Sequence, residues 1–275
     1  KACKAYKQQK GIVIKQVWLL LNQKGYSQHG IKKLYWKLRF AMHYGYYSKD
    51  VSVISVSDEM NRFITKYHKL IWHSPIAKIR TLPNGIEVSR CGERTDFSKH
   101  EPFTFLAFGR SNVQKRIDLL TSAAEILITK GRHLKIMITK GDAYDAICQL
   151  YGGNQPQWIE WIAPSDDIVS IFQKVDCFVS SSLHETFSYA VCEASIYGLP
   201  VIQSDIEGTL WNAENPSTLL FHTLDVNDLA RQMDAIMSMS ESEIAKNCII
   251  TRDRNKSEYT IQKWCQNVIE FYRHL

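Results

Sequence analysis

The chain has 275 residues, 45% of them hydrophobic, and a net charge of +6. This length and composition are typical of a globular protein with a real core, in one large domain or two ordinary ones. No apolar run approaches the roughly 18 residues of a membrane span, which excludes a spanning helix, and no signal peptide is recognisable. The seven cysteines include no Cys-x-x-Cys pair. Several lie in apolar runs, so we expect buried, reduced thiols in a cytoplasmic protein.

The positive charge is concentrated at the start of the chain. Residues 1–49 hold eleven Lys and Arg and no Asp or Glu, which leaves 23 basic and 28 acidic groups to residues 50–275. Tryptophans and tyrosines are interleaved with the basic groups. This pattern suits an anionic membrane surface, with nucleic acid much less favoured. A solvated helical face with a few packed aromatic rings is the alternative.

The first part of the chain is predicted to be mostly helical. Residues 1–49 form the helical part, with breaks at glycines. Residues 51–56 alternate like a strand, and Ser57 or Asp58 would cap the helix that follows. A short strand from Lys78 ends in a Pro-Asn-Gly turn, where we place a domain boundary.

After this boundary, strand-like apolar runs alternate with segments of helical spacing. The predicted strands are 103–108, 134–139, 158–162, 177–180, 200–203 and an edge strand at 218–221. The predicted helices are one that stops at Gly131, one that begins at Ser165 or Asp166, one that carries Glu193, and a long final helix over 259–275. Such alternation predicts an α/β fold, a doubly wound parallel sheet with helices on both faces.

One stretch, residues 184–194, combines a strand end, a polar turn and a helix start. It places Glu185 before the helix and Glu193 inside it, eight residues apart. The turn would lie at the carboxyl edge of the sheet, where open α/β sheets bind ligands. The amides of Phe187, Ser188 and Tyr189 would be free to meet an anion. Carboxylates accept hydrogen bonds from sugar hydroxyls, so a ligand with phosphate and sugar fits.

A second group of residues follows the first strand of this region. Gly109-Arg110 ends the strand, and Lys115 and Arg116 open the next helix. Fixed cations at this place suit a diphosphate. Surface cations flanking a loop are the alternative. The segment lacks the Gly-Lys-Ser/Thr ending of a P-loop, and the chain has no Gly-x-Ser-x-Gly hydrolase turn.

These motifs follow one another in a recognisable order. The ordered set is Gly109-Arg110, Lys115, Glu185, Glu193, Gly198-Leu199-Pro200-Val201 and Ser204-Asp205-Ile206-Glu207-Gly208. It resembles the nucleotide-sugar half of retaining glycosyltransferases with the GT-B fold. The likeness is greatest to the glycosyltransferase group 1 family of bacterial lipopolysaccharide and capsule enzymes. The resemblance covers roughly residues 50–275.

The resemblance implies a division of the chain. Residues 1–82 would be the carboxyl-terminal remnant of an acceptor domain, and residues 83–256 the Rossmann-like nucleotide-sugar domain. Residues 257–275 would form a terminal helix that packs back toward the acceptor domain. The chain starts at Lys1 rather than at a methionine. We therefore expect most of the acceptor domain to lie upstream of it.

The resemblance also implies roles for particular residues. Arg110 and Lys115 would neutralise the donor diphosphate, and Glu185 would hold hydroxyls of the transferred sugar; these three are the expected catalytic residues. Glu193 would hold the ribose hydroxyls. The remaining expected contacts are the amides of Phe187 and Ser188, and Gly208 in the loop lining the sugar pocket. No cofactor and no metal are implied, and the donor would be a UDP-sugar, with a GDP-sugar as the alternative.

The sequence departs from the family pattern at three places. Arg116 stands where glycine usually follows the lysine, and Ser188 where glycine is common. The family's Gly-x-Gly nucleotide loop is reduced to Lys140-Gly141-Asp142-Ala143. These departures bear on the backbone near the phosphates and on contacts to the base.

The expected activity is metal-independent transfer of a hexose to a polysaccharide or lipid-linked glycan, with retention of configuration. The enzyme would be peripheral at the inner face of the cell membrane through residues 1–49, without nucleic acid as a partner. One alternative is a nucleotide-sugar binding module without independent turnover, which a truncated chain would favour. Another is a GT-B-fold epimerase or phosphorylase. Product analysis would separate these alternatives.

Overall fold

The computed structural model describes residues 52–73, 76, 78–109 and 112–274, together with 14–17 and the single positions 31, 34, 35 and 38. Contacts group the chain into two compact units, Lys1–Gly85 with Ile261–Leu275, and Ile86–Thr260. Each unit has its own parallel sheet. All candidate site residues belong to the second unit.

The first unit contains a three-stranded sheet in the order β1-β2-β3. Its strands are β1 (Ile14–Val17), β2 (Ser52–Ser55) and β3 (Lys78–Thr81). Strand β1 corrects the prediction of helix for this part of residues 1–49. Its backbone pairs in parallel with the buried strand β2, and such long-range pairing overrides local helical preference.

Helices α4 (Asp58–Trp72) and α12 (Ile261–Arg273) belong to the same unit. Helix α4 begins after Ser57, as predicted, and the Ser57 hydroxyl accepts the amide of Met60 at 3.3 Å. Helix α12 comes from the far end of the chain. Its Phe271 packs with the buried core residue Ile54 of β2, so residues remote in sequence share one core.

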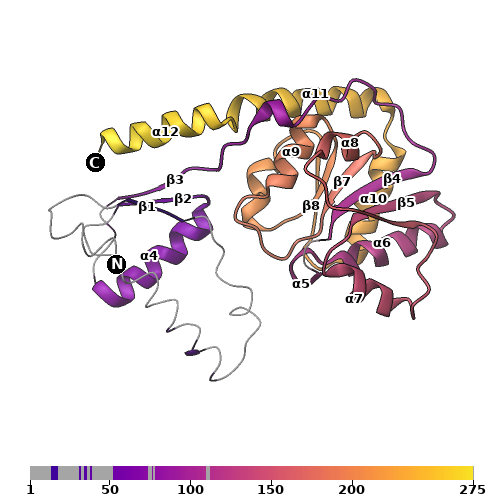
Figure 1. Ribbon diagram of the computed structural model, residues 1–275, viewed down its shortest axis with the longest axis horizontal. Coiled ribbons are helices and arrows are strands. Elements are labelled where there is room, and N and C mark those ends of the chain that lie inside the picture. The colour runs from indigo at the N-terminus through magenta and orange to yellow at the C-terminus, as the bar shows by residue number, and fades with distance from the viewer. Residues whose placement is uncertain are drawn as a thin grey trace. The chain divides into compact units, whose positions relative to one another are not determined.

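The second unit is built on the predicted doubly wound parallel sheet (Figure 1). Its six strands lie in the order β6-β5-β4-β7-β8-β9. The strands are β4 (Phe103–Phe108), β5 (Leu134–Thr139), β6 (Ile159–Ile162), β7 (Cys177–Ser180), β8 (Val201–Ser204) and β9 (Thr218–Phe221). Strands β4, β7 and β8 are almost wholly buried, because helices cover both faces of a parallel sheet.

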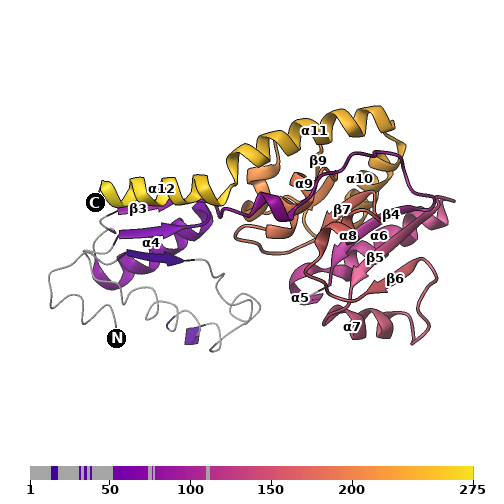
Figure 2. The same ribbon diagram turned by 45° about the horizontal axis from the view of Figure 1, so that its top comes forward.

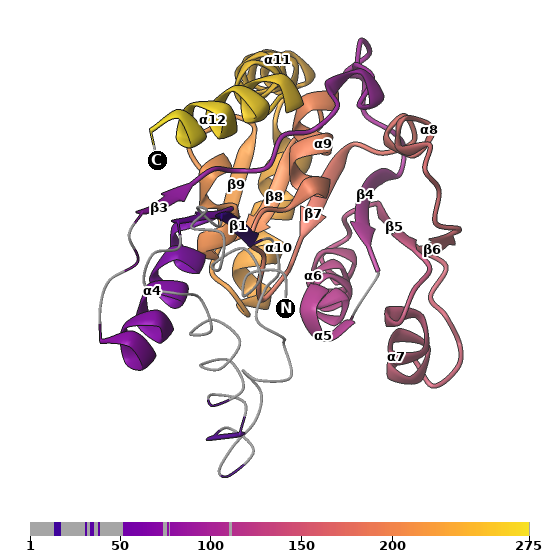
Figure 3. The ribbon, with the colours of Figure 1, turned by 60° about the vertical axis from the view of Figure 1, so that its left-hand side comes forward.

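The covering helices fall on two sides of this sheet (Figure 3). They are α5 (Asn112–Lys115), α6 (Ile117–Thr129), α7 (Ala143–Leu150), α8 (Ile168–Phe172), α9 (Tyr189–Tyr197), α10 (Val226–Ser238) and α11 (Glu241–Glu258). Helices α6, α7 and α10 pack into one core cluster, and α8 and α9 into the cluster on the other face. Helix α11 packs along α9 (Figure 2). Two 3-10 turns, η1 (Val88–Arg90) and η2 (Glu207–Asn212), complete the unit.

The start of α8 differs from the prediction. The helix begins at Ile168, and its N-cap is Asp167, whose carboxylate accepts the amide of Ser170 at 3.1 Å. The Ser165 hydroxyl instead accepts the amide of Asp167 at 3.1 Å. Ser165 therefore forms a turn before the helix, which is the common competing use of a serine side chain.

Four cysteines, Cys91, Cys177, Cys192 and Cys248, are buried and free, as their apolar surroundings predicted. Burial raises the pKa of the Cys91 thiol to about 11 and that of Cys248 to about 12. These thiols therefore stay protonated and unreactive at neutral pH.

The order of the strands creates one special point in the sheet. Strands β4 and β7 are neighbours, but β4 is followed in sequence by β5 on one side, and β7 by β8 on the other. The segments leaving their carboxyl ends therefore diverge. Open α/β sheets bind ligands at such a switch point, and the segments that leave β4 and β7 carry most of the candidate residues.

Candidate functional site

The first wall of the site is the segment between β4 and α6. A Cβ on Gly109 would lie 2.5 Å from the Thr139 carbonyl oxygen, so only glycine lets β4 end so close to β5. The next candidate, Arg110, lies outside the described residues. The second wall is the segment between β7 and α9, which carries Glu185. Lys115 is the last residue of α5, and its side chain reaches Glu185.

The two walls are joined by an ion pair. Lys115 Nζ lies 2.5 Å from Glu185 Oε1, and the two side chains are only 20% and 10% exposed. The Ser182 hydroxyl donates to the same carboxylate oxygen at 2.9 Å. The structure therefore brings together two candidates that are seventy residues apart in sequence, and it leaves both partly shielded from water.

Hydrogen bonds between the two walls fix this arrangement. The amide of Leu183 donates to the Gln114 carbonyl at 2.8 Å, and the Gln114 side-chain amide donates to the His184 carbonyl at 2.8 Å. The Ser181 hydroxyl donates to the Lys115 carbonyl at 2.6 Å. Glu185 and Lys115 thus stand on segments whose backbones hold each other, a preorganised pair of walls.

Arg116, the residue that replaces the usual glycine, does not add a cation to the site. Its φ of 47° lies in the left-handed region, which explains why glycine suits this position. Its guanidinium donates to the Asp118 carboxylate at 2.8–3.1 Å. This hydrogen bonding raises the pKa of Arg116, whose charge is already paired.

The helix start differs from the prediction by two residues. Helix α9 begins at Tyr189, and Ser188 is its N-cap, with its hydroxyl near the amide of Val191 at 3.5 Å. The first helical amides therefore belong to Tyr189 and Ala190, and Phe187 precedes the cap. Ser188 has a φ of −80°, so a side chain is tolerated where glycine is common.

Glu193 lies one turn further along α9 and is half-buried. Burial raises the pKa of its carboxyl group, and the charge of Arg90 opposes this only in part. Within the described residues, no side chain forms a hydrogen bond or an ion pair with Glu193. A partly desolvated carboxylate without a partner is costly for the free protein and is typical of a binding position.

Gly208 of η2 presses against the backbone of the Glu185 segment. A Cβ at this position would lie 1.6 Å from the Glu185 carbonyl oxygen and 3.1 Å from the Thr186 amide. Gly208 therefore acts by close approach rather than by a special φ. Glu185 therefore meets Gly208 through its backbone and Lys115 through its carboxylate.

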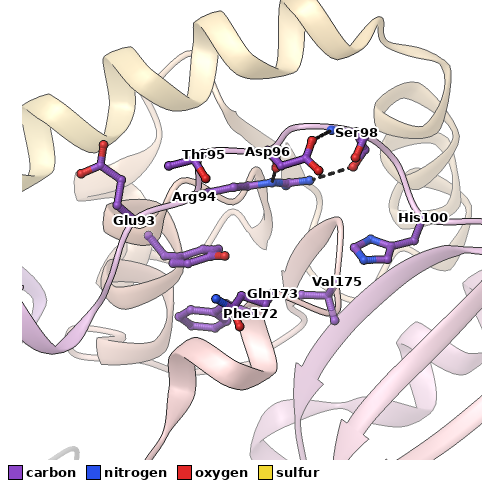
Figure 4. Close-up of a pocket in the computed structure, with 10 residues that line it drawn as sticks. Glu93, Arg94, Thr95, Asp96, Ser98, His100, Phe172, Gln173 and Val175 are labelled. Carbon is purple, nitrogen blue, oxygen red and sulfur yellow. Dashed lines mark hydrogen bonds between the residues drawn. The ribbon is translucent and has the colours of Figure 1, made fainter.

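The cavities near and away from these residues differ in size. A cavity of about 10 Å³ beside Lys115 is lined by ends of β4 and β7, and it has room for about one water. A larger cavity of about 210 Å³ is lined by Arg94, Asp96, His100, Gln173 and other residues (Figure 4). It lies at the amino ends of β4 and β7, away from every candidate residue.

Two residues that line the larger cavity, Arg94 and His100, bind the buried Asp176. Asp176 is 2% exposed and accepts the amides of His100 and Thr104 at 3.0 and 2.7 Å, and the ring nitrogen of His100 lies at 2.9 Å. Arg94, beside it, donates to the Asp176 and Ser98 carbonyls at 3.3 Å each. These groups tie the loop before β4 to the sheet, so we interpret the cavity as part of the scaffold.

We therefore expect Asp176→Ala to destabilise the protein without weakening nucleotide binding. Loss of the carboxylate leaves buried donors unsatisfied, at a cost of about 3–5 kcal/mol. Urea unfolding measures the change in stability, and titration of the folded variant with UDP measures binding. A fall in affinity as large as that of a Glu193 variant would contradict the scaffold interpretation.

Comparisons with known proteins identify the family. Residues 102–239, half of the chain, match the family model described as "Glycosyl transferases group 1". The chain belongs to this glycosyltransferase family. The matched range runs from the start of β4 to the end of α10 and includes Lys115, Glu185 and Glu193.

One curated relative of this group 1 glycosyltransferase is the Escherichia coli UDP-Gal:alpha-D-GlcNAc-diphosphoundecaprenol alpha-1,3-galactosyltransferase. It is 23% identical over an alignment of 213 positions that covers 71% of this chain and 54% of that protein. The chain thus spans about half the length of this relative.

Solved structures share the fold. Sucrose-phosphate synthase from Thermosynechococcus elongatus has a TM-score of 0.75 at 16% identity, covering 98% of this chain and 70% of that one. Anabaena Alr3699/HepE in complex with UDP has a TM-score of 0.80 at 13% identity, covering 100% and 75%. These likenesses confirm the predicted GT-B fold of the glycosyltransferase.

Three contributors to the site of this glycosyltransferase were not predicted from its sequence. Ser182 donates to the Glu185 carboxylate, Gln114 bridges the two walls, and Trp211 stacks on Phe187 at 4.9 Å between ring centroids. Ser182 and Gln114 lie within three residues of a predicted candidate, so adjacency was a usable signal. Trp211 lies three residues after the candidate Gly208, but nothing local indicated that it would stack on Phe187, 24 positions earlier.

Proposed function

We propose that this group 1 glycosyltransferase transfers a sugar from a nucleotide diphosphate sugar, with retention of configuration, to a polysaccharide or lipid-linked glycan. A UDP-sugar is the favoured donor. The main support for this proposal is the Lys115–Glu185 ion pair at the switch point of the sheet. The E. coli relative is named for UDP-Gal, and HepE was solved with UDP, which supports this donor class.

In this proposal the diphosphate lies between the two walls. Lys115 and Arg110 neutralise its charge, and the first amides of α9 face it, because a helix start carries partial positive charge. Glu185 accepts hydroxyls of the transferred sugar. Glu193 accepts those of the ribose, and its carboxylate, which has no hydrogen-bond partner among the described residues, gains hydrogen bonds from the nucleotide.

The chemistry follows from where charge develops. When the bond between the anomeric carbon and the phosphate oxygen breaks, its electron pair stays on that oxygen. Preplaced Lys115 and helix amides stabilise this charge without reorganisation, so the proposal needs no metal ion. The bound donor must replace the direct Lys115–Glu185 contact. Its phosphate then binds the Lys115 ammonium, and its sugar hydroxyls donate to the Glu185 carboxylate.

The two compact units suit a division into a donor domain and an acceptor domain. We propose that the unit Ile86–Thr260 is the donor domain and that the other unit belongs to the acceptor domain, including α12. The three-stranded parallel sheet of the first unit supports this assignment, since GT-B enzymes are built from two such α/β domains.

Calorimetric titration with UDP, GDP and ADP tests the proposal, with Glu193→Ala as the control. Binding of UDP in preference to the others, lost in the variant, is the expected result. Equal binding of all three, or binding that survives the substitution, would argue against the site. Product analysis with UDP-galactose or UDP-glucose then separates transfer from isomerisation and phosphorolysis.

A nucleotide-sugar binding module without independent turnover is the second candidate. It is favoured by one observation, that the chain spans 54% of its E. coli relative. Such a module would bind UDP as above but release no free UDP from a UDP-sugar in the presence of acceptor glycans. Transfer by the chain itself would eliminate this candidate.

We expect Glu193→Gln to stabilise the ligand-free protein while weakening UDP and UDP-sugar alike. The pKa of Glu193 in the folded protein lies above its ordinary value of 4.5. The folded state therefore holds this proton more tightly, and stability falls as pH rises from 4.5 through the raised pKa. The gain in Tm should appear at pH 7 and vanish near pH 4. A variant that is less stable than wild type at pH 7 would contradict this reading.

We also propose contact between residues 1–49 and the inner face of the cell membrane. The exposed side chains of Ile31, Leu34, Tyr35 and Leu38 recur at helical spacing, which places them on one face. Lysines 32, 33 and 37 are interleaved with them. No helix among the described residues combines the length and apolar composition needed to cross a membrane.

Vesicle co-sedimentation tests this contact. We expect binding that grows with anionic lipid content, since each basic residue near such a surface contributes about 1 kcal/mol. Lys32→Glu with Lys33→Glu should weaken it, whereas Lys246→Glu on the exposed side of α11 should not. Binding that is indifferent to anionic lipid would refute the idea.

A further inference from the structure

The η2 turn touches the Glu185 segment at two points. Gly208 approaches the Glu185 carbonyl so closely that no side chain fits between them. Three residues later, the Trp211 ring stacks on the Phe187 ring, with centroids 4.9 Å apart and an interplanar angle of 20°. One short turn therefore contacts this segment both at the backbone of Glu185 and just before the cap of α9.

Trp211 is itself held firmly. Tyr259 meets its ring edge-on at 4.6 Å. The next residue, Asn212, is fully buried and donates to the Thr218 hydroxyl at 2.9 Å and to Gln203 at 3.3 Å. Asn215 donates to the Asn212 oxygen at 2.7 Å; the further donor to this oxygen is Asn255 of α11, at 3.2 Å. This buried network fixes the backbone that carries Trp211.

Phe187 connects this fixed backbone to the candidate site. Its ring is 4% exposed, and besides Trp211 it meets Tyr259 at 5.7 Å and Tyr189 at 5.6 Å. Phe187 lies two residues after Glu185 and one before the N-cap Ser188. Fixing its ring therefore constrains the backbone of the short segment that carries Glu185.

We propose that Trp211 is a positioning residue for the sugar-binding carboxylate, acting through Phe187 on Glu185. This inference rests on the proposed function, because it assigns Glu185 to the transferred sugar. The Trp211 indole nitrogen is buried and has no hydrogen-bond partner among the described residues. The ring thus acts by packing and by its flat face, which a phenylalanine also supplies.

The test compares Trp211→Leu, Trp211→Phe and Trp158→Leu in the intact chain. Trp158, just before β6 at the opposite edge of the sheet, meets Tyr151 edge-on at 6.0 Å, so it is a matched tryptophan remote from the site. Dissociation constants for UDP-galactose, UDP-glucose and UDP are measured by calorimetry. Circular dichroism confirms folding; if the leucine variant does not fold, Trp211→Met replaces it.

We expect the Trp211→Leu variant to lose about tenfold or more in affinity for the UDP-sugar that wild type binds, and less for UDP. The Trp211→Phe variant should recover most of the loss, and Trp158→Leu should show none. In a Glu185→Gln background, Trp211→Leu should cost little more. Additive effects of the two substitutions, or equal losses for UDP and UDP-sugar, would overturn the positioning role. Absence of any UDP binding by wild type would instead refute the proposed donor site.

Discussion

Replacing Glu185 with Gln is expected to lower kcat/KM for the nucleotide sugar by about 10- to 150-fold, corresponding to about 1.5–3 kcal/mol for a charged hydrogen bond. The amide keeps the size of the side chain but loses the charge that hydroxyl donors favour. Affinity for UDP should change much less, since Lys115 and the amides of α9 remain.

The matched control for this prediction is Glu160→Gln. Glu160 forms a similar ion pair, with Lys135 at 2.6 Å, but the side chains of this pair are more exposed, at 43% and 30%. Surface pairs contribute about 0–1 kcal/mol, so this variant should bind both ligands as wild type does. Titration with UDP and with the UDP-sugar gives the comparison. If the Glu185 variant loses equal affinity for UDP and for the UDP-sugar, Glu185 binds the nucleotide rather than the sugar.

The second large effect is expected from Gly208→Ala. The added Cβ would stand 1.6 Å from the Glu185 carbonyl oxygen and 2.4 Å from its carbon, both backbone atoms that cannot rotate away. The loop must therefore move, and a displacement on the order of 1 Å at a reacting group costs about a hundredfold in rate. Overpacking of this kind also lowers stability by about 1–3 kcal/mol.

Gly131→Ala separates this steric effect from backbone strain. Gly131 follows α6 with a φ of +81°, and an added Cβ would meet no atom within 4 Å. Its alanine variant should lose about 1–2 kcal/mol of stability through the left-handed conformation alone, with wild-type affinity for UDP. Turnover, UDP-sugar affinity and urea unfolding are measured for both variants to compare the two effects. A fully active Gly208→Ala variant would show that the loop can yield.

Secondary structure in the second unit followed closely from local pattern. Runs such as Phe103–Phe108 and Leu134–Thr139 are apolar enough to be recognised as buried strands, and Gly131 ends α6 where expected. Strand β1 was missed, because its partner β2 lies some forty residues later and no local signal reports that pairing. The boundary of α8 was misplaced because Ser165 and Asp167 can each serve as a cap.

The amino-acid sequence by itself determined the doubly wound sheet and the order of its motifs, because strand and helix periods are local properties of the chain. Only the tertiary structure decided which side chains meet. The switch point between β4 and β7 brings Lys115 into contact with Glu185. The η2 turn brings Gly208 and Trp211 into contact with the segment that carries Glu185 and Phe187. These contacts depend on strand order and on close packing between distant segments. Burial of Glu193, and with it the raised pKa, likewise follows from packing.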